Sequence, residues 1–141
     1  MSLLFKIAQN IAEKVSEIQF NGEKITATVD LAPELDMYKL KERSVFVTPQ
    51  VYTRSNISRS ESAVVAKLNI AVCERITTDE LDSRIELVET IASTLERSVL
   101  QQKDLLAVVS SVEFDPIYDA ESLLTKRCFV SICSVTVKVL K

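Results

Sequence analysis

The chain has 141 residues, of which 47% are hydrophobic, and this is enough apolar material for one domain with a sizeable core. Its 17 basic and 20 acidic residues give a net charge of −3, which argues against nucleic-acid binding by the chain as a whole. With no histidine and one glycine, histidine-based catalytic or metal sites and glycine-rich phosphate loops are excluded.

The first predicted element is an amphipathic helix over residues 2–18. Apolar residues recur through it at helical spacing, and Ser2 is placed to cap its N-terminus. Gly22, which follows the helix, predicts a tight turn with a positive φ angle. Alternating apolar and polar residues then predict a half-buried strand over residues 25–31.

The middle of the chain predicts a long hairpin. Residues 32–43 have no clear periodicity and are expected to form a surface loop. A strand is expected over residues 44–53, where Pro49 restricts it to a sheet edge or a bulge. Residues 54–62 are polar and form the expected hairpin tip. Residues 63–75 return as a strand that is apolar on both faces and is therefore expected at the centre of a sheet.

The rest of the chain is organised around one long amphipathic helix, predicted over residues 77–100. Its apolar positions recur in steps of four and three: Leu81, Ile85, Val88, Ala92, Leu95 and Val99. Thr77 and Glu80 have the form of a capping box at its start. A stripe of this kind has to be buried, which favours a helix packed on a sheet.

Two further extended segments close the chain. Residues 105–114 are predicted to be a strand, Asp115 and Pro116 mark a turn, and residues 123–140 are expected inside the sheet. The order helix, three strands, helix, two strands predicts a single α+β domain over residues 1–141. We expect a mixed or antiparallel sheet of about five strands, two helices on one face and a long protruding hairpin.

No residue of the sequence is predicted to be catalytic, to bind a cofactor or to bind a metal. The three cysteines are expected to be buried, reduced thiols, and Cys128 and Cys133 fall on opposite faces of a strand. The carboxylate clusters are typical of loop solvation, helix capping and a turn. The chain also lacks the apolar core of a signal peptide and any run of about twenty apolar residues. We therefore expect a protein that is not an enzyme and does not bind a membrane.

Basic residues are concentrated in one section of the chain. Residues 39–75 carry seven basic and three acidic residues, a charge of +4, which leaves −7 for the remainder. Such segregation is usual for a solvated face, and it also occurs on surfaces that meet a charged partner. The candidate assembly interface in this section consists of Lys39, Lys41, Arg43, Arg54, Asn56, Arg59 and Glu61.

Several features of the chain, taken in order, carry a family resemblance. They are the N-terminal helix, the polar hairpin over residues 44–75, the long helix begun near Thr77, the run Phe114-Asp115-Pro116-Ile117-Tyr118-Asp119, a further helical or loop turn, and a last strand of the type Arg127-Cys128-Phe129-Val130. This layout is similar to that of phage tail terminator and head-to-tail joining (neck) proteins. The similarity covers nearly the whole chain and is one of pattern.

The resemblance implies a structural protein of a phage virion. Members of the family assemble into a ring, commonly of six subunits, that caps the tail tube and joins it to the head connector. The implied partners are further copies of the chain, the tail tube protein and the head connector or stopper protein, with the tail sheath protein as a further candidate. DNA would only pass through the lumen. The implied location is the neck of the virion, assembled in the cytoplasm of the bacterial host.

Other readings stay open. The chain could be a different phage neck or head-completion protein, or a binding module similar to type III secretion chaperones. Such chaperones typically end in a helix, whereas this chain is predicted to end in a strand. An enzyme would need a pocket built from cysteine, lysine and carboxylates alone, and the sequence offers no activating pair.

Overall fold

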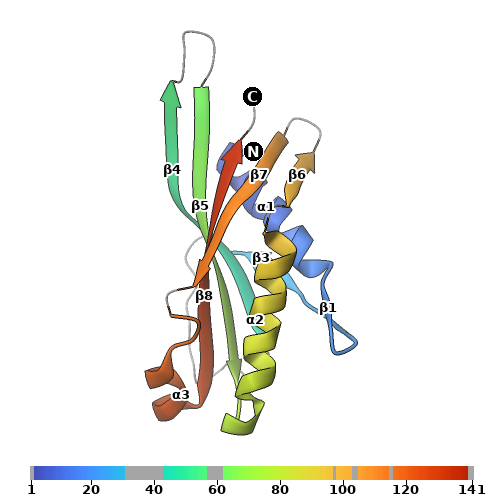
Figure 1. Ribbon diagram of the computed structural model, residues 1–141, viewed down its shortest axis with the longest axis vertical. Helices are drawn as coiled ribbons and strands as arrows, with labels where there is room; N and C mark the ends of the chain where they lie inside the picture. The colour runs from blue at the N-terminus through green and yellow to red at the C-terminus, as the bar shows by residue number, and fades with distance from the viewer. Residues whose placement is uncertain are drawn as a thin grey trace.

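The computed structural model describes residues 2–30, 43–56, 62–96, 98–102, 105–114 and 116–139. Six strands form the main sheet: β3 (Ala27–Val29), β4 (Ser44–Asn56), β5 (Ser62–Arg75), β6 (Val99–Gln102), β7 (Leu105–Phe114) and β8 (Cys128–Val139). Their order across the sheet is β3-β4-β5-β8-β7-β6. Helices α1 (Leu3–Ser16) and α2 (Leu81–Leu95) pack on the face that we call the inner face, and α3 (Ala120–Lys126) lies at the end where β8 begins (Figure 1).

The sheet is mixed, and the predicted α+β class is confirmed. β3 runs parallel to β4, whereas the other four strand pairs are antiparallel. β5 and β8 lie at the centre, as their two-sided apolar patterns predicted. The sheet has six strands where about five were expected, because the short strand β6 forms at the end of the segment predicted as helix.

The N-terminal predictions are confirmed in outline. The Ser2 hydroxyl accepts a hydrogen bond from the backbone N–H of Phe5 at 3.2 Å and caps α1. After α1, the short strands β1 (Gln19–Phe20) and β2 (Glu23–Lys24) form a hairpin whose turn residues, Asn21 and Gly22, have φ angles of 53° and 80°. An Asn-Gly pair suits this left-handed turn. The predicted strand over residues 25–31 is shorter than expected, since β3 spans Ala27–Val29.

Helix α2 differs from its prediction at both ends and in its buried stripe. A 3-10 turn over Thr78–Glu80 precedes it, and the predicted capping box is confirmed. The helix ends at Leu95, and residues predicted as its last turn form β6, where Leu100 pairs with Ala107 and is fully buried. The residues it buries are Leu87, Val88, Ile91 and Leu95. Val99, predicted to belong to the stripe, is 50% exposed on β6.

The C-terminal half is corrected in one respect. Residues 123–127, predicted as part of the last strand, belong to α3 and its cap, so β8 begins at Cys128. Asp119 caps α3 and Arg127 ends it with a φ angle of 53°. Asp119 favours the start of a helix, but no long apolar period announces this one, because it is only seven residues long.

One core fills the space between the helices and the inner face of the sheet. It includes Ile7, Ile11 and Val15 of α1, Leu87 and Ile91 of α2, and Leu68, Ile70, Val135 and Val137 of the central strands. The opposite, outer face carries a second, small buried cluster of Ala71, Cys73, Cys128 and Val130. All three cysteines are buried, as predicted, and none of them forms a disulfide.

Candidate assembly surfaces

The end of the β4–β5 hairpin extends past the helices and the other strands (Figure 1). We call residues 51–56 of β4 and 62–67 of β5 the arm. Within the arm, β5 is still paired with β8 from Val64 onward, and Val64 and Ala66 belong to the core. The pairing is continuous to Asn56 and Ser62 at its end, so the arm is regular β-structure. The tip was predicted over residues 54–62, but residues 54–56 and Ser62 are paired strand residues, and residues 57–61 lie outside the described part of the chain.

The arm presents side chains that a core would normally bury. A bulge between Pro49 and Val51 shifts the register, as the proline predicted. Beyond it, Val51 is 49% exposed and Tyr52 is 38% exposed. β3 pairs only with Val45–Val47 of β4, so among the described strands the far edge of β4 along the arm has no neighbour. Exposed apolar groups on a free strand edge are typical of a surface that meets another chain.

Arg54 lies on the arm beside Tyr52. One of its Nη atoms donates to the tyrosine hydroxyl at 3.0 Å, and its guanidinium carbon is 6.0 Å from the centre of the ring. Both side chains are exposed. Because the contact is solvated, it contributes little to stability, and it leaves a cation and an aromatic ring available together.

The remaining predicted interface residues fall in different places. Lys39, Lys41, Arg59 and Glu61 lie outside the described residues. Asn56 ends β4. Arg43 lies just before β4, and its Nε atom contacts Glu74 at 3.2 Å with only 18% of its side chain exposed. The structure thus brings Arg54 and Asn56 together on the arm and ties Arg43 into the domain, while the role of the set in assembly stays a prediction.

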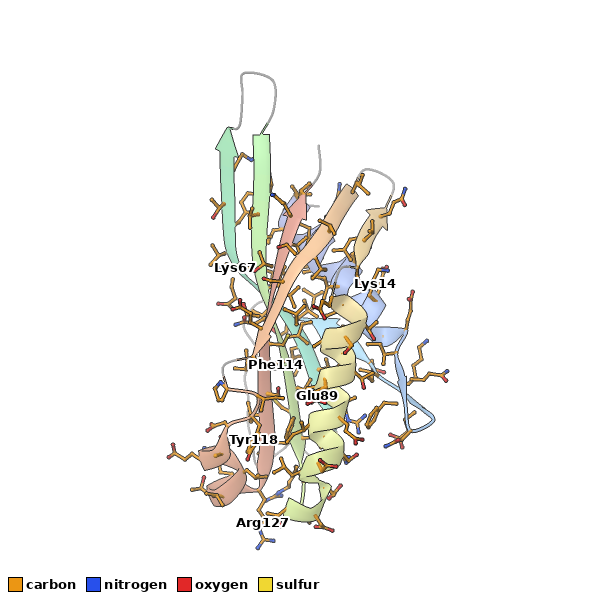
Figure 2. All side chains as sticks on the ribbon, in the orientation of Figure 1. Lys14, Lys67, Glu89, Phe114, Tyr118 and Arg127 are labelled. Atoms are coloured by element: carbon orange, nitrogen blue, oxygen red, sulfur yellow. The ribbon has the colours of Figure 1, made fainter. Side chains whose placement is uncertain are left out.

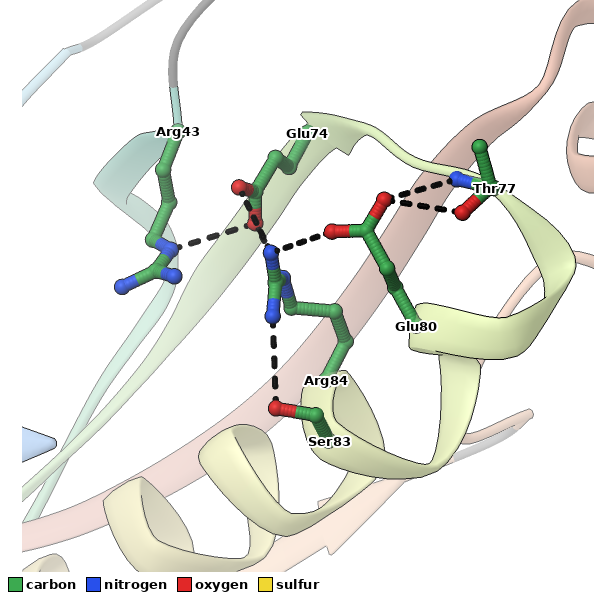
Figure 3. A network of polar contacts seen from close by, with 6 residues as sticks. All are labelled: Arg43, Glu74, Thr77, Glu80, Ser83 and Arg84. Carbon is green, nitrogen blue, oxygen red and sulfur yellow. Dashed lines mark hydrogen bonds and ion pairs between the residues drawn. The ribbon is translucent and has the colours of Figure 1, made fainter. Parts of the chain in front are cut away.

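Arg43 belongs to a polar network that fixes the start of α2 on β5 (Figure 3). Arg84 is bound to Glu74 in a bidentate contact, with Nε at 2.6 Å from one oxygen and Nη2 at 3.2 Å from the other. Nη2 also lies 3.0 Å from Glu80. The side chains of Arg84 and Glu74 are 15% and 14% exposed. This network was not predicted, because its members come from separate elements.

The capping box completes this network. The backbone N–H and the hydroxyl of Thr77 donate to one oxygen of Glu80 at 3.1 and 2.9 Å. These hydrogen bonds, the backbone one first, hold the pKa of Glu80 below its ordinary value, and the Thr77 side chain lowers the pKa of Asp79. The start of α2 is therefore anionic at neutral pH, which suits the positive end of the helix dipole.

The outer face of the sheet has no helix of the described chain across its middle and upper part. Register places Val51, Val65, Lys67, Val108 and Lys138 on this face, and we call these residues the arm face. Lys67 and Lys138 are exposed, and Val65 and Val108 are partly exposed. The arm face is therefore apolar with two cations. Its lysines were missed, since the candidate set was taken from the loop and hairpin tip alone.

The outward side of α2 is acidic along its length. Asp82, Glu86 and Glu89 on the helix and Glu96 just after it are all exposed, and we call these four residues the acidic stripe. Their spacing of four, three and seven places them on one side of a helix. Within the described part of the chain, no cation contacts this stripe. The sequence contains these acidic residues at helical spacing, on the same helix whose apolar residues predicted the buried stripe.

The described residues also form grooves and contain buried thiols. A groove of about 640 Å³ lies between α1 and β3 and is lined by residues such as Phe5, Glu13 and Lys24. Burial raises the pKa of Cys73 to about 11 and that of Cys133 to about 12, so neither is a thiolate at neutral pH. In the ranges that the structure covers, no three His, Cys, Asp or Glu side chains are grouped to hold a metal ion.

Of the helices described, none is long and apolar enough to cross a membrane. No protein-family model and no curated protein matches the sequence.

Solved structures align with nearly the whole chain. One, which carries an identifier in place of a descriptive name, aligns at a TM-score of 0.58 and 10% identity over 100% of this chain and 97% of its own. At that identity the likeness shows a common fold alone. A chain from the virion of a native gene transfer agent (GTA) particle aligns at a TM-score of 0.49 and 12% identity, over 98% of this chain and 94% of its own. A TM-score of 0.49 supports no conclusion about this chain.

Proposed function

We propose that this protein is a structural subunit of a phage particle, a tail terminator that forms a ring, caps the tail tube and joins it to the head connector. The proposal combines the family resemblance of the sequence with the surface of the arm. In this role the protein is structural and not catalytic. Its partners are further copies of the chain, the tube protein and the connector protein.

The observation that carries the proposal is the arm. Its β5 strand pairs with β8 and buries Val64 and Ala66, whereas its β4 strand gains little burial within the subunit for the conformational entropy that ordering it costs. Val51 and Tyr52 remain exposed on it, next to a strand edge without a described neighbour. Contact with a neighbouring subunit would bury these groups and pair the edge, which makes the arm suited to assembly.

The test is to image purified protein by negative stain and weigh it by mass photometry, alone and mixed with tail tubes or tube protein. We expect rings of the protein, or caps at one end of the tubes. Arg54→Glu should leave the fold unchanged, because substitutions of exposed residues rarely change stability by more than about 0.5 kcal/mol, and it should reduce the fraction of capped tubes.

Lys24→Glu is the matched control, since Lys24 is an exposed cation on the β1–β2 hairpin. It should cap tubes as the wild type does. A protein that ignores tubes and purifies as a stable dimer with bound polypeptide would contradict the proposal and favour a chaperone. Capping of head portals in place of tubes would favour a head-completion protein.

A further inference from the structure

The arm face and the acidic stripe lie on opposite sides of one subunit. Residues of the arm face project from the outer face of the sheet, whereas α2 packs on the inner face and turns its acidic stripe to solvent. Figure 2 shows Lys67 on the arm and Glu89 on α2, to the right of it. Two different surfaces that face away from each other can meet only between separate copies of the chain.

The charges of the two surfaces are complementary. The outer face of the described sheet carries three exposed cations, Lys67, Lys138 and Arg75, and one exposed acid, Glu113, a charge of +2. The acidic stripe carries four carboxylates. Opposite charge on two patches of one chain fixes which patch meets which, because contact between like patches brings like charges together.

We propose that the arm face of one subunit binds the acidic stripe of α2 on the next copy of the chain. Lys67 and Lys138 then lie against Glu86 and Glu89 of the neighbour, and Val51, Val65 and Val108 are covered by its helix. The contact is heterologous, because it uses a different surface from each subunit. Repetition of a heterologous contact gives a ring when the rotation closes. The inference rests on the proposed ring assembly and names its surfaces.

Charge reversal on each surface tests this pairing. One variant carries Lys67→Glu and Lys138→Glu, so both of its surfaces are acidic. The other carries Glu86→Lys and Glu89→Lys, so lysines at the centre of its stripe would face the lysines of the arm face, although Asp82 and Glu96 keep their charge. Each variant alone should associate at least about 100-fold more weakly than the wild type, because the proposed charge pairs become pairs of like charge. An equimolar mixture should assemble again, since the introduced glutamates of one variant then meet the introduced lysines of the other.

The mixture makes misfolding distinguishable from loss of the contact. Each variant should give the wild-type circular dichroism spectrum, and a single-substitution pair, Lys138→Glu with Glu86→Lys, replaces any that does not. Matched controls are Lys24→Glu and Glu17→Lys, which reverse exposed charges outside both surfaces and should associate as the wild type does. Assembly should also weaken with salt, because exposed charges are screened within about 8 Å at 0.15 M.

The readouts are mass photometry of the free protein and counting of capped tubes. Variants that assemble as the wild type does, a mixture that fails to recover, or a wild type that neither associates nor caps tubes would each overturn the inference. Rings that show the expected charge dependence but never cap tubes would contradict the proposed function and leave the contact between surfaces standing.

Discussion

Arg84 is predicted to contribute more to the stability of the domain than any exposed cation. Arg84→Ala removes the bidentate contact with Glu74 and the contact with Glu80. Helix propensity does not oppose the change, since alanine is at least as favourable as arginine within a helix. The substitution removes the ion pair between Glu74 and Arg84, whose side chains are 14% and 15% exposed.

The magnitude follows from that burial. Removing one partner of a fully buried pair costs about 3–5 kcal/mol. Glu74 keeps some solvent and keeps Arg43 at 3.2 Å, so we expect Arg84→Ala to lower the free energy of unfolding by about 2–3 kcal/mol. Arg43→Ala removes one longer contact and leaves the bidentate pair, so it should cost about 1 kcal/mol.

The assay is urea unfolding followed by circular dichroism, at a concentration where the protein is monomeric. Arg75→Ala is the matched control, because Arg75 follows Glu74 in β5 but is exposed on the outer face, and it should stay within about 0.5 kcal/mol of the wild type. A double-mutant cycle of Glu74→Ala with Arg84→Ala should give a coupling of about 1 kcal/mol or more. If Arg84→Ala costs no more than Arg75→Ala, the network does not hold α2 on the sheet and the reasoning is refuted.

Three further predictions concern the core, the acid range and the thiols. Leu87→Ala, at a fully buried position, should cost about 2–5 kcal/mol by chemical denaturation, while Leu124→Ala, at a position that is 79% exposed, should leave the unfolding midpoint nearly unchanged. Hydrogen bonds from Ser122 lower the pKa of Asp119, so this group stabilises the fold above its ordinary pKa and loses that effect as the pH falls toward its lowered value. Thermal melts between pH 6 and 3 should show this decline, and it should be shallower in Asp119→Ala. A thiol reagent at pH 8 should leave the native protein unreacted over minutes and label all three cysteines after unfolding, and fast labelling of the native protein would contradict the burial of Cys73, Cys128 and Cys133.

Local signals were enough to predict much of the fold. Caps, turns and bulges depend on a residue's own backbone or on a neighbour a few residues away. The structure confirms the predicted roles of the Ser2 cap, the capping box of Thr77 and Glu80, the turn at Gly22 and the bulge at Pro49. Continuous apolar character was also sufficient to place β5 and β8 at the centre, because only a strand covered on both faces can bury it.

The errors come from contacts between distant parts of the chain. The apolar period of α2 continues through Val99, so periodicity alone extends the helix, but pairing with β7 converts this end to a strand and buries Leu100. Periodicity also could not choose between stripes, since Ile85 and Leu87 both fit a helical face and packing decides that Leu87 is fully buried. The parallel pairing of β3 with β4 is likewise a tertiary choice.

The candidate surfaces were partly out of reach for the same reason. Arg54 could be proposed from the charge of the hairpin, but the arm face combines residues from β4, β5, β7 and β8 that only the register brings together. A strand pattern tells which residues share a face of one strand, whereas the neighbours across the sheet depend on strand order. The sequence therefore gave no reason to place Lys138 on the same face of the sheet as Lys67.

Arg84 connects the stability of the domain with the charge of its surface. It is the only cation in Leu81–Leu95, and it points to Glu74 and Glu80 at the start of the helix. Had it faced outward, it could have paired with carboxylates of the acidic stripe on the same helix. Because it is used to hold α2 on β5, Glu86 and Glu89 are left to solvent, and no cation of the described residues contacts them. The contact that fastens the helix to the sheet thus also leaves its outer side uniformly negative, which is the condition that the proposed contact with the arm face requires.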